Sequence, residues 1–122
     1  MAHTNTWNEH GLFRKFSEEI SPEEILQSNF DIHACPEFET IKYIINDFTE
    51  VTDLVINTNH TKIYASTDDI ISDTKGNLKI AIVAKLDAHI ALANNYREEM
   101  KNKFFKCEIF QTLKEAQIWA EL

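Results

Sequence analysis

The sequence has few of the residues that phosphate-binding loops, disulfide frameworks and membrane spans require. Its 122 residues include two glycines, two prolines and two cysteines, and they contain no glycine-rich phosphate loop or dinucleotide fingerprint. Cys35 and Cys107 lie far apart and outside any CxxC pair, so we expect reduced thiols. No window approaches the roughly 18 apolar residues that span a bilayer, and the N-terminus does not have the pattern of a signal peptide. These absences predict a cytoplasmic protein without a cofactor.

Basic residues are also in the minority. Twenty acidic residues against twelve basic ones give a formal net charge of −8, which repels phosphate backbones at long range. We therefore expect no nucleic acid partner. The content of 43% hydrophobic and 26% charged residues is that of an ordinary globular protein. Because this length suits one compact core, we predict a single domain over residues 1–122.

The first third of the chain carries clear signals for a hairpin and a helix. Trp7 and residues 12–16 predict two short strands, with Gly11 in the turn at positive φ. Ser21-Pro22-Glu23-Glu24 combines an N-cap serine, a proline at the first helical position and a capping box, so a helix begins there. Its expected buried stripe includes Phe30. The residue before Pro36 is pushed out of the α region, which ends the helix.

The rest of the chain alternates between strand and helix patterns. Residues 41–48 and 78–84 are short and continuously apolar, which is typical of central strands covered on both faces. The other predicted elements are a helix over 59–74, a helix capped by Asp87, a half-exposed strand over 105–109 and a helix from Thr112. The order predicts an α/β fold, with a mixed, mostly parallel sheet of about four to five strands flanked by helices.

Several residues occur at positions that are typical of one fold family. In chain order they are Trp7, Gly11, Phe16, Pro22-Glu23-Glu24, Phe38, Tyr43-Ile44-Ile45-Asn46-Asp47-Phe48, Val51, Ile80-Ala81-Ile82-Val83, Phe110, Leu113, Glu115, Ala116 and Trp119. On these residues the chain resembles the SpoIIAA-like, or STAS, fold, and especially small bacterial proteins related to CRAL-TRIO lipid-binding domains. The resemblance implies a homodimeric, non-enzymatic binding or interaction module. The resemblance implies that the module binds a small apolar or lipid-like ligand or a membrane-associated partner protein. Peripheral contact with a membrane is therefore among the expected interactions.

The phosphorylation motif of STAS anti-sigma-factor antagonists is incomplete in this chain. In those proteins an Asp-Ser-Ser/Thr-Gly motif follows the equivalent strand, and its first hydroxyl is phosphorylated. Here the corresponding segment is Val51-Thr52-Asp53-Leu54-Val55-Ile56. Asp53 matches the motif, but the hydroxyl pair and the glycine are missing. We therefore expect no phosphoserine switch.

Asp47 has two interpretations. It closes the apolar run and precedes an apparent polar turn, so it resembles the phosphoacceptor of a response-regulator receiver and would centre a phospho-signalling or enzymatic domain. That chemistry needs an early acidic pair and a hydroxyl after the next strand. Glu18-Glu19 follow a hairpin strand, however, and Ala84 stands where the hydroxyl is wanted. We favour a carboxylate that accepts backbone N–H bonds near Thr49.

An apolar triplet, Leu54-Val55-Ile56, falls inside the segment predicted as a loop over 48–64. If exposed, it would form a lid, a dimer seam or a membrane-touching patch; alternatively it starts the next helix and is buried. His33 and Cys35 are the only close pair of soft ligands, so we predict no metal site. We also predict no catalytic residue. The predicted ligand-binding residues are Asp47, Phe48, Asp53, Leu54, Val55, Ile56 and Tyr64.

Overall fold

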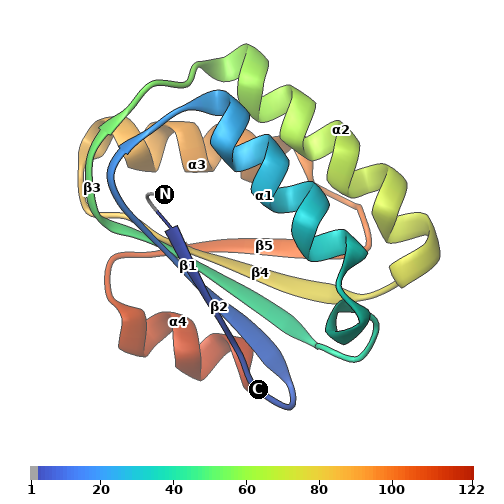
Figure 1. The fold of residues 1–122 in the computed structure, drawn as a ribbon. Helices are drawn as coiled ribbons and strands as arrows, with labels where there is room; N and C mark the ends of the chain where they lie inside the picture. Colours follow the sequence, from blue (N-terminus) through green and yellow to red (C-terminus); the bar gives the residue numbers. More distant parts are fainter. Residues whose placement is uncertain (1–2) are drawn as a thin grey trace.

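Five strands form one mixed sheet in the order β1-β2-β3-β4-β5 in this computed structural model, which describes residues 3–122 (Figure 1). The strands are β1 (His3–Trp7), β2 (Gly11–Ile20), β3 (Tyr43–Leu54), β4 (Leu78–Val83) and β5 (Phe105–Phe110). Only the β1–β2 pair is antiparallel, and the other three pairs are parallel. The predicted α/β fold with a mostly parallel sheet is confirmed.

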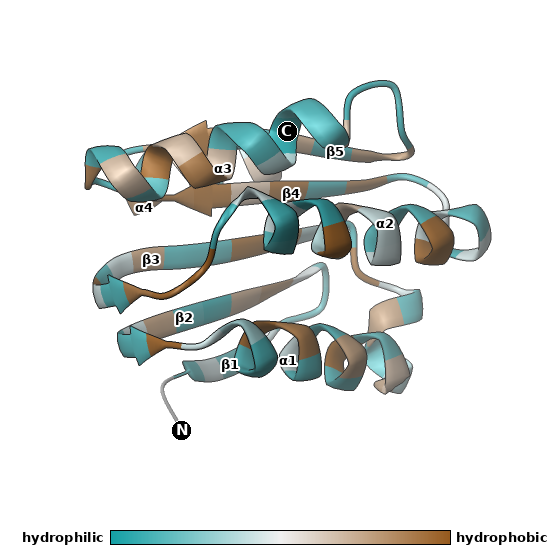
Figure 2. Ribbon diagram, turned by 90° about the horizontal axis from the view of Figure 1, so that it is seen from above, coloured by the Kyte–Doolittle hydropathy of each residue, from teal (hydrophilic) through white to brown (hydrophobic). Residues whose placement is uncertain are grey.

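Three helices cover one face of the sheet and one covers the other. They are α1 (Pro22–Ala34), α2 (Thr58–Lys75), α3 (Asp87–Glu99) and α4 (Leu113–Ala120), and a short 3-10 helix spans Pro36–Glu39. The strand order follows the chain, so right-handed crossovers place all three connecting helices on the same side. Figure 1 shows α1, α2 and α3 above the sheet and α4 below it. Seen from above in Figure 2, β4 is hydrophobic along most of its length, as suits a strand between two layers.

Helices α1 and α4 begin where the capping signals predict, whereas the predicted cap of α3 is wrong, because Asp87 is its first residue and Leu86 precedes it without a side-chain cap. Ser21 Oγ accepts a hydrogen bond of 3.2 Å from Glu24 N at the start of α1, and Thr112 Oγ1 accepts one of 3.2 Å from Glu115 N at the start of α4. Asn57 caps α2 through a complete capping box. These bonds satisfy donors that the first helical turn otherwise leaves free.

The inward face of α1 differs from the prediction. Phe30 is 49% exposed, whereas Ser28 and Asn29 are buried on the side of α1 that faces the sheet. The helix is turned this way because Ser28 and Asn29 accept hydrogen bonds from a buried arginine of β2. An apolar periodicity read from the sequence cannot anticipate a polar contact of this kind.

The predicted turn after Asp47 is wrong, because β3 continues to Leu54. Asp47 pairs with Val83, the last residue of β4. Beyond that point β3 pairs only with β2, as far as Ile20 opposite Leu54, with two register irregularities on the way. The polar residues of this stretch are tolerated because the two-stranded ribbon is only partly covered. The predicted loop over 48–64 is therefore the end of β3, a short connection and the first turns of α2.

Gly11 also differs from the prediction. Gly76, with φ +83°, is the only glycine at positive φ in the described chain, so Gly11 does not use that freedom. A Cβ atom at Gly11 would instead lie 2.2 Å from Cε1 of Tyr43. Glycine is required here by the close approach of a buried ring.

Candidate functional site

A cavity of about 90 Å³ lies between the sheet and the layer formed by α1, α2 and α3. Most of its lining is apolar and comes from both layers. The apolar and aromatic residues are Ile25, Ile44, Phe48, Leu54, Ile56, Tyr64, Ile80, Ile82, Leu92, Ala93 and Tyr96, and the polar residues are Arg14, Asn29, Asn46, Thr61, Asp68 and His89. An apolar cavity with a few convergent polar groups is the usual form of a small-molecule site.

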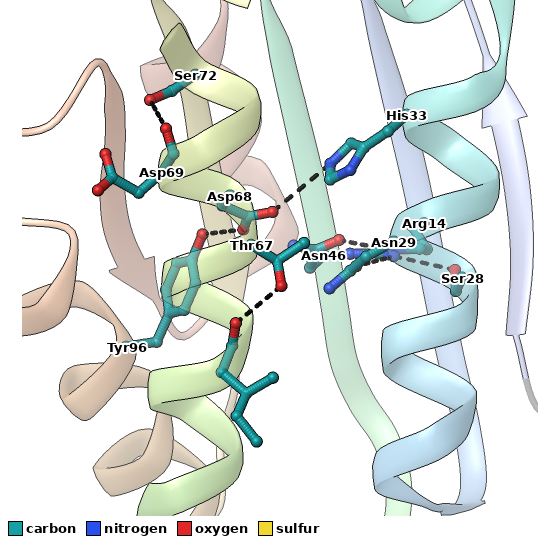
Figure 3. Close-up of polar contacts among 11 residues, drawn as sticks. Arg14, Ser28, Asn29, His33, Asn46, Thr67, Asp68, Asp69, Ser72 and Tyr96 are labelled. Atoms are coloured by element: carbon teal, nitrogen blue, oxygen red, sulfur yellow. Dashed lines mark hydrogen bonds and ion pairs between the residues drawn. The ribbon is translucent and has the colours of Figure 1, made fainter.

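Arg14 lies on the inner face of β2 because side chains alternate along a strand. Its neighbours on that face, Leu12 and Phe16, are fully buried, and Arg14 itself is only 6% exposed. Its guanidinium donates to Asn46 Oδ1 through Nε at 2.8 Å, and through Nη1 to Ser28 Oγ at 3.0 Å and Asn29 Oδ1 at 2.8 Å (Figure 3). Burial lowers the pKa of Arg14 to about 10, so the side chain is charged at neutral pH.

Asp68 carries the opposing charge from the buried face of α2. Its Oδ2 accepts a hydrogen bond of 2.5 Å from the hydroxyl of Tyr96, and its Oδ1 lies 3.5 Å from His33 Nε2. Figure 3 shows Asp68 between Tyr96 on one side and His33 on the other. No carboxylate oxygen of residues 3–122 forms an ion pair with Arg14 within 4.0 Å. Arg14 and Asp68 thus carry opposite charges and line the same cavity, but they do not form an ion pair.

Burial shifts the pKa of both members of the Asp68–His33 contact. It raises the pKa of Asp68 to about 6, against the lowering effects of the Tyr96 hydroxyl and of Arg14. It lowers the pKa of His33 to about 4, and the charge of Arg14 acts in the same direction. At neutral pH the carboxylate is therefore mostly ionised and the imidazole is neutral, so their contact is not a full ion pair.

His89 contributes a further polar group from the first turn of α3. It is 8% exposed, and its Nδ1 is buried without a hydrogen-bond partner in the described part of the chain. Burial lowers its pKa, while the charge of Asp53 acts in the opposite direction. An unpartnered buried nitrogen costs free energy unless something in the cavity satisfies it.

The structure brings together four of the seven predicted ligand-binding residues. Phe48, Leu54, Ile56 and Tyr64 line the cavity. Leu54 and Ile56 face inward while Val55 between them is 52% exposed, so the apolar triplet closes one edge of the cavity and does not start a helix.

Asp47 and Asp53 do not line the cavity. Asp47 lies on the face of the sheet that α4 covers, with Ile45 and Val83, and its Oδ1 accepts a hydrogen bond of 2.9 Å from Thr49 N. This bond is of the local kind expected from the sequence, although it lies within a strand and not in a turn. Asp53 is exposed near the end of β3.

Sequence reasoning missed the two charged residues of the cavity. Arg14 stands at an inward position between Leu12 and Phe16, and Asp68 follows Tyr64 and Ala65 at helical spacing on the buried face of α2. Each is a charged residue at a position where the periodic pattern predicts an apolar one. That exception is the sequence signal that could have identified both residues as members of a site.

Other candidate chemistry has less support from the geometry. Within residues 3–122, no group of three or more His, Cys, Asp or Glu side chains could hold a metal ion, and none of the described helices is long and apolar enough to cross a membrane. Two wider hollows of about 380 and 540 Å³ lie at the surface, one beside Arg97 and Trp119 and one beside His10 and Leu122. Neither contains a buried polar atom without a partner.

Comparison with known proteins identifies the fold. No protein-family model and no curated protein matches the sequence. Among solved structures, the chain is similar to an uncharacterised protein of the DUF3478 family with a SpoIIAA-like fold from Shewanella loihica, with 16% identity and a TM-score of 0.53 over 98% of this chain and 92% of the other. At this identity the likeness concerns the fold alone. The chain therefore has the SpoIIAA-like fold that its sequence pattern predicts.

Proposed function

We propose that this protein is a non-enzymatic binding module whose ligand is a small, mainly apolar molecule held between the sheet and helices α1, α2 and α3. The observation that carries the proposal is the cavity itself, which is mainly apolar and yet is lined by His89, whose buried Nδ1 has no hydrogen-bond partner in the described residues. A well-packed core has neither feature.

The size of the cavity favours a small ligand over a lipid. At about 90 Å³ it is smaller than the engineered cavities of roughly 150 Å³ that hold benzene or xenon. A long acyl chain does not fit such a volume without displacement of a helix. A ligand of a few carbon atoms does.

The alternative, an enzymatic or phospho-signalling domain centred on Asp47, has less in its favour. Asp47 lies on the opposite face of the sheet from the cavity, and one of its oxygens is engaged by the backbone of Thr49. The buried cluster on its face is apolar, with Ile45, Ala81 and Ala116 among its members, and the residue opposite Asp47 on β2 is Lys15. These surroundings are typical of a structural carboxylate.

Binding of xenon, an apolar probe of suitable size, tests the proposal. We expect xenon to shift the backbone amide NMR signals of cavity residues such as Ile44 and Leu92 in the wild-type protein. Ala93→Leu, which adds a side chain at a buried cavity position, should abolish these shifts. Ala91→Leu on the exposed side of the same helix is the matched control. If xenon leaves the cavity signals unchanged, or Ala93→Leu responds like wild type, the proposal is wrong.

Native mass spectrometry of freshly purified protein addresses the ligand and the oligomeric state together. We expect a small co-purifying mass that is absent from Ala93→Leu. The homodimer stays a prediction, and the same spectra check it.

A further inference from the structure

The guanidinium of Arg14 has hydrogen-bonding capacity that the protein does not use. Burial lowers its pKa against the raising effect of the Asp68 charge, and the centroid of the Phe16 ring lies 5.0 Å from Cζ, but no ion pair within 4.0 Å forms in residues 3–122. The three hydrogen bonds of Arg14 go to the neutral oxygens of Ser28, Asn29 and Asn46, and they occupy Nε and Nη1. Nη2 makes no hydrogen bond to any part of residues 3–122. Burying a charge in this way is costly unless an opposite charge pairs with it.

Asp68, the carboxylate of the same cavity, contacts Tyr96 and His33 and not Arg14. Asp68 is engaged by the hydroxyl of Tyr96 and lies beside the ring of His33. Both Arg14 and Asp68 line the cavity, without an ion pair between them. The space beside Arg14 therefore suits a group that accepts a hydrogen bond from Nη2 and brings a negative charge.

We propose that the ligand of this cavity is a short-chain monocarboxylic acid, whose carboxylate accepts a charge-assisted hydrogen bond from Arg14 and whose hydrocarbon part lies against the apolar lining. This inference rests on the proposed function and names the class of its ligand. The volume limits the chain to a few carbon atoms. A carboxylate is preferred to a neutral polar group because it adds Coulomb attraction to the hydrogen bond and pairs the buried charge of Arg14.

Asp68 makes the binding dependent on pH. A second carboxylate in the same cavity disfavours ionisation of Asp68, so the complex takes up one proton and the two carboxyl groups share a single negative charge. The groups that face Asp68 from the other elements are Arg14 on β2, His33 on α1, Tyr96 on α3 and Cys107 on β5. His33 is neutral above about pH 4, and burial raises the pKa of Cys107 to about 12 and that of Tyr96 well above its ordinary value. Asp68 is thus the group that takes up the proton near pH 6.

Titration with butyrate, and with its neutral isostere butyramide, tests the inference by amide NMR and calorimetry. At pH 6 we expect wild-type protein to bind butyrate at least about tenfold more tightly than butyramide. Above the pKa of Asp68, the affinity for butyrate should fall by up to about tenfold per pH unit, whereas that for butyramide should not change.

Two variants should remove the preference for butyrate over butyramide by different means. Arg14→Gln deletes the charge, and Asn46→Asp supplies a carboxylate at the position that already accepts from Arg14 Nε. Both should bind butyrate and butyramide equally. Asn46→Asp keeps the size of the side chain and pairs the buried charge, so it serves as the test even if Arg14→Gln does not fold.

The outcomes separate this inference from the proposed function. If xenon binds but butyrate binds no more tightly than butyramide, the inference is wrong and the apolar binding module stands. The inference is also wrong if Asn46→Asp retains the preference for butyrate. If neither xenon nor butyrate binds, both proposals are wrong.

Discussion

Arg14 and Asn46 lie opposite each other in the parallel register of β2 and β3, and their side chains are joined by a hydrogen bond of 2.8 Å from Nε to Oδ1. Both residues are buried, with 6% and 8% of their surfaces exposed. A polar pair in the centre of an otherwise apolar sheet face ties α1 to β3, because the same guanidinium also bonds to Ser28. The positions of the polar lining residues Arg14, Asn29 and Asn46 therefore depend on this hydrogen-bonded pair.

Asn46→Ala should cost about 2–3 kcal/mol in free energy of unfolding, because it leaves a buried charged donor without its acceptor. Chemical denaturation of the variant and the wild type measures the difference. Asn5→Ala, at an exposed position of the edge strand β1, is the control and should change stability by less than about 0.5 kcal/mol. Equal effects of the two substitutions would show that the Arg14–Asn46 bond contributes nothing to stability.

Asp68 and His33 should make opposite contributions to stability between about pH 4 and pH 6. The pKa of Asp68 is raised from 3.8 to about 6 on folding, so its contribution is present below pH 3.8 and is lost as the pH rises through 6. The pKa of His33 is lowered from 6.5 to about 4, so its contribution is present above pH 6.5 and is lost as the pH falls through 4. The two effects largely cancel in the wild type.

Single substitutions should expose each contribution in urea titrations at pH 4 to 7. Relative to wild type, Asp68→Asn should lose stability as the pH falls, and His33→Gln should gain stability as the pH falls. Each difference is on the order of 1–3 kcal/mol over the range. Asp73→Asn, at an exposed position of α2, should follow the wild-type curve. Parallel curves for all four proteins would contradict the assignment of these two groups.

The sequence predicted the order of elements because capping boxes and continuous apolar strands are local signals. Ser21 and Thr112 cap helices as expected, and the parallel sheet follows from the alternation of strands and helices. The end of β3 was missed for a nonlocal reason. Beyond Asp47 the strand is held by β2 alone, and a partly exposed two-stranded ribbon accepts the polar residues that otherwise indicate a turn.

The candidate site was only partly predictable for a similar reason. Apolar members such as Phe48 and Ile56 follow from hydrophobicity near the predicted loop. Arg14 and Asp68 are distant in sequence, and each is an exception within its own element. Only the packing of β2 beside β3 and of α2 above them places both residues at one cavity.

Asp47→Asn should preserve both the fold and ligand binding. The amide oxygen of asparagine can still accept the hydrogen bond from Thr49 N, so we expect a loss of no more than about 1 kcal/mol in free energy of unfolding. Because Asp47 lies on the α4 face of the sheet, xenon and butyrate should bind with unchanged affinity. Loss of binding in a normally folded variant would favour a functional centre at Asp47.

The two glycines should respond differently to the same substitution. Gly76→Ala places a side chain at φ +83° in open space, which costs about 1 kcal/mol through backbone strain alone. Gly11→Ala should cost more, because the added Cβ meets the ring of Tyr43, which is only 5% exposed and is held by a hydrogen bond of 3.1 Å from Asn8 Nδ2.

A double-mutant cycle distinguishes these two causes. Tyr43→Leu removes the ring, so Gly11→Ala in that background should cost at least about 1 kcal/mol less than in the wild type, whereas the cost of Gly76→Ala should be the same in both backgrounds. Urea denaturation of the six proteins gives both differences. If Tyr43→Leu fails to reduce the cost of Gly11→Ala, the close approach of ring and backbone is not what requires glycine at this position.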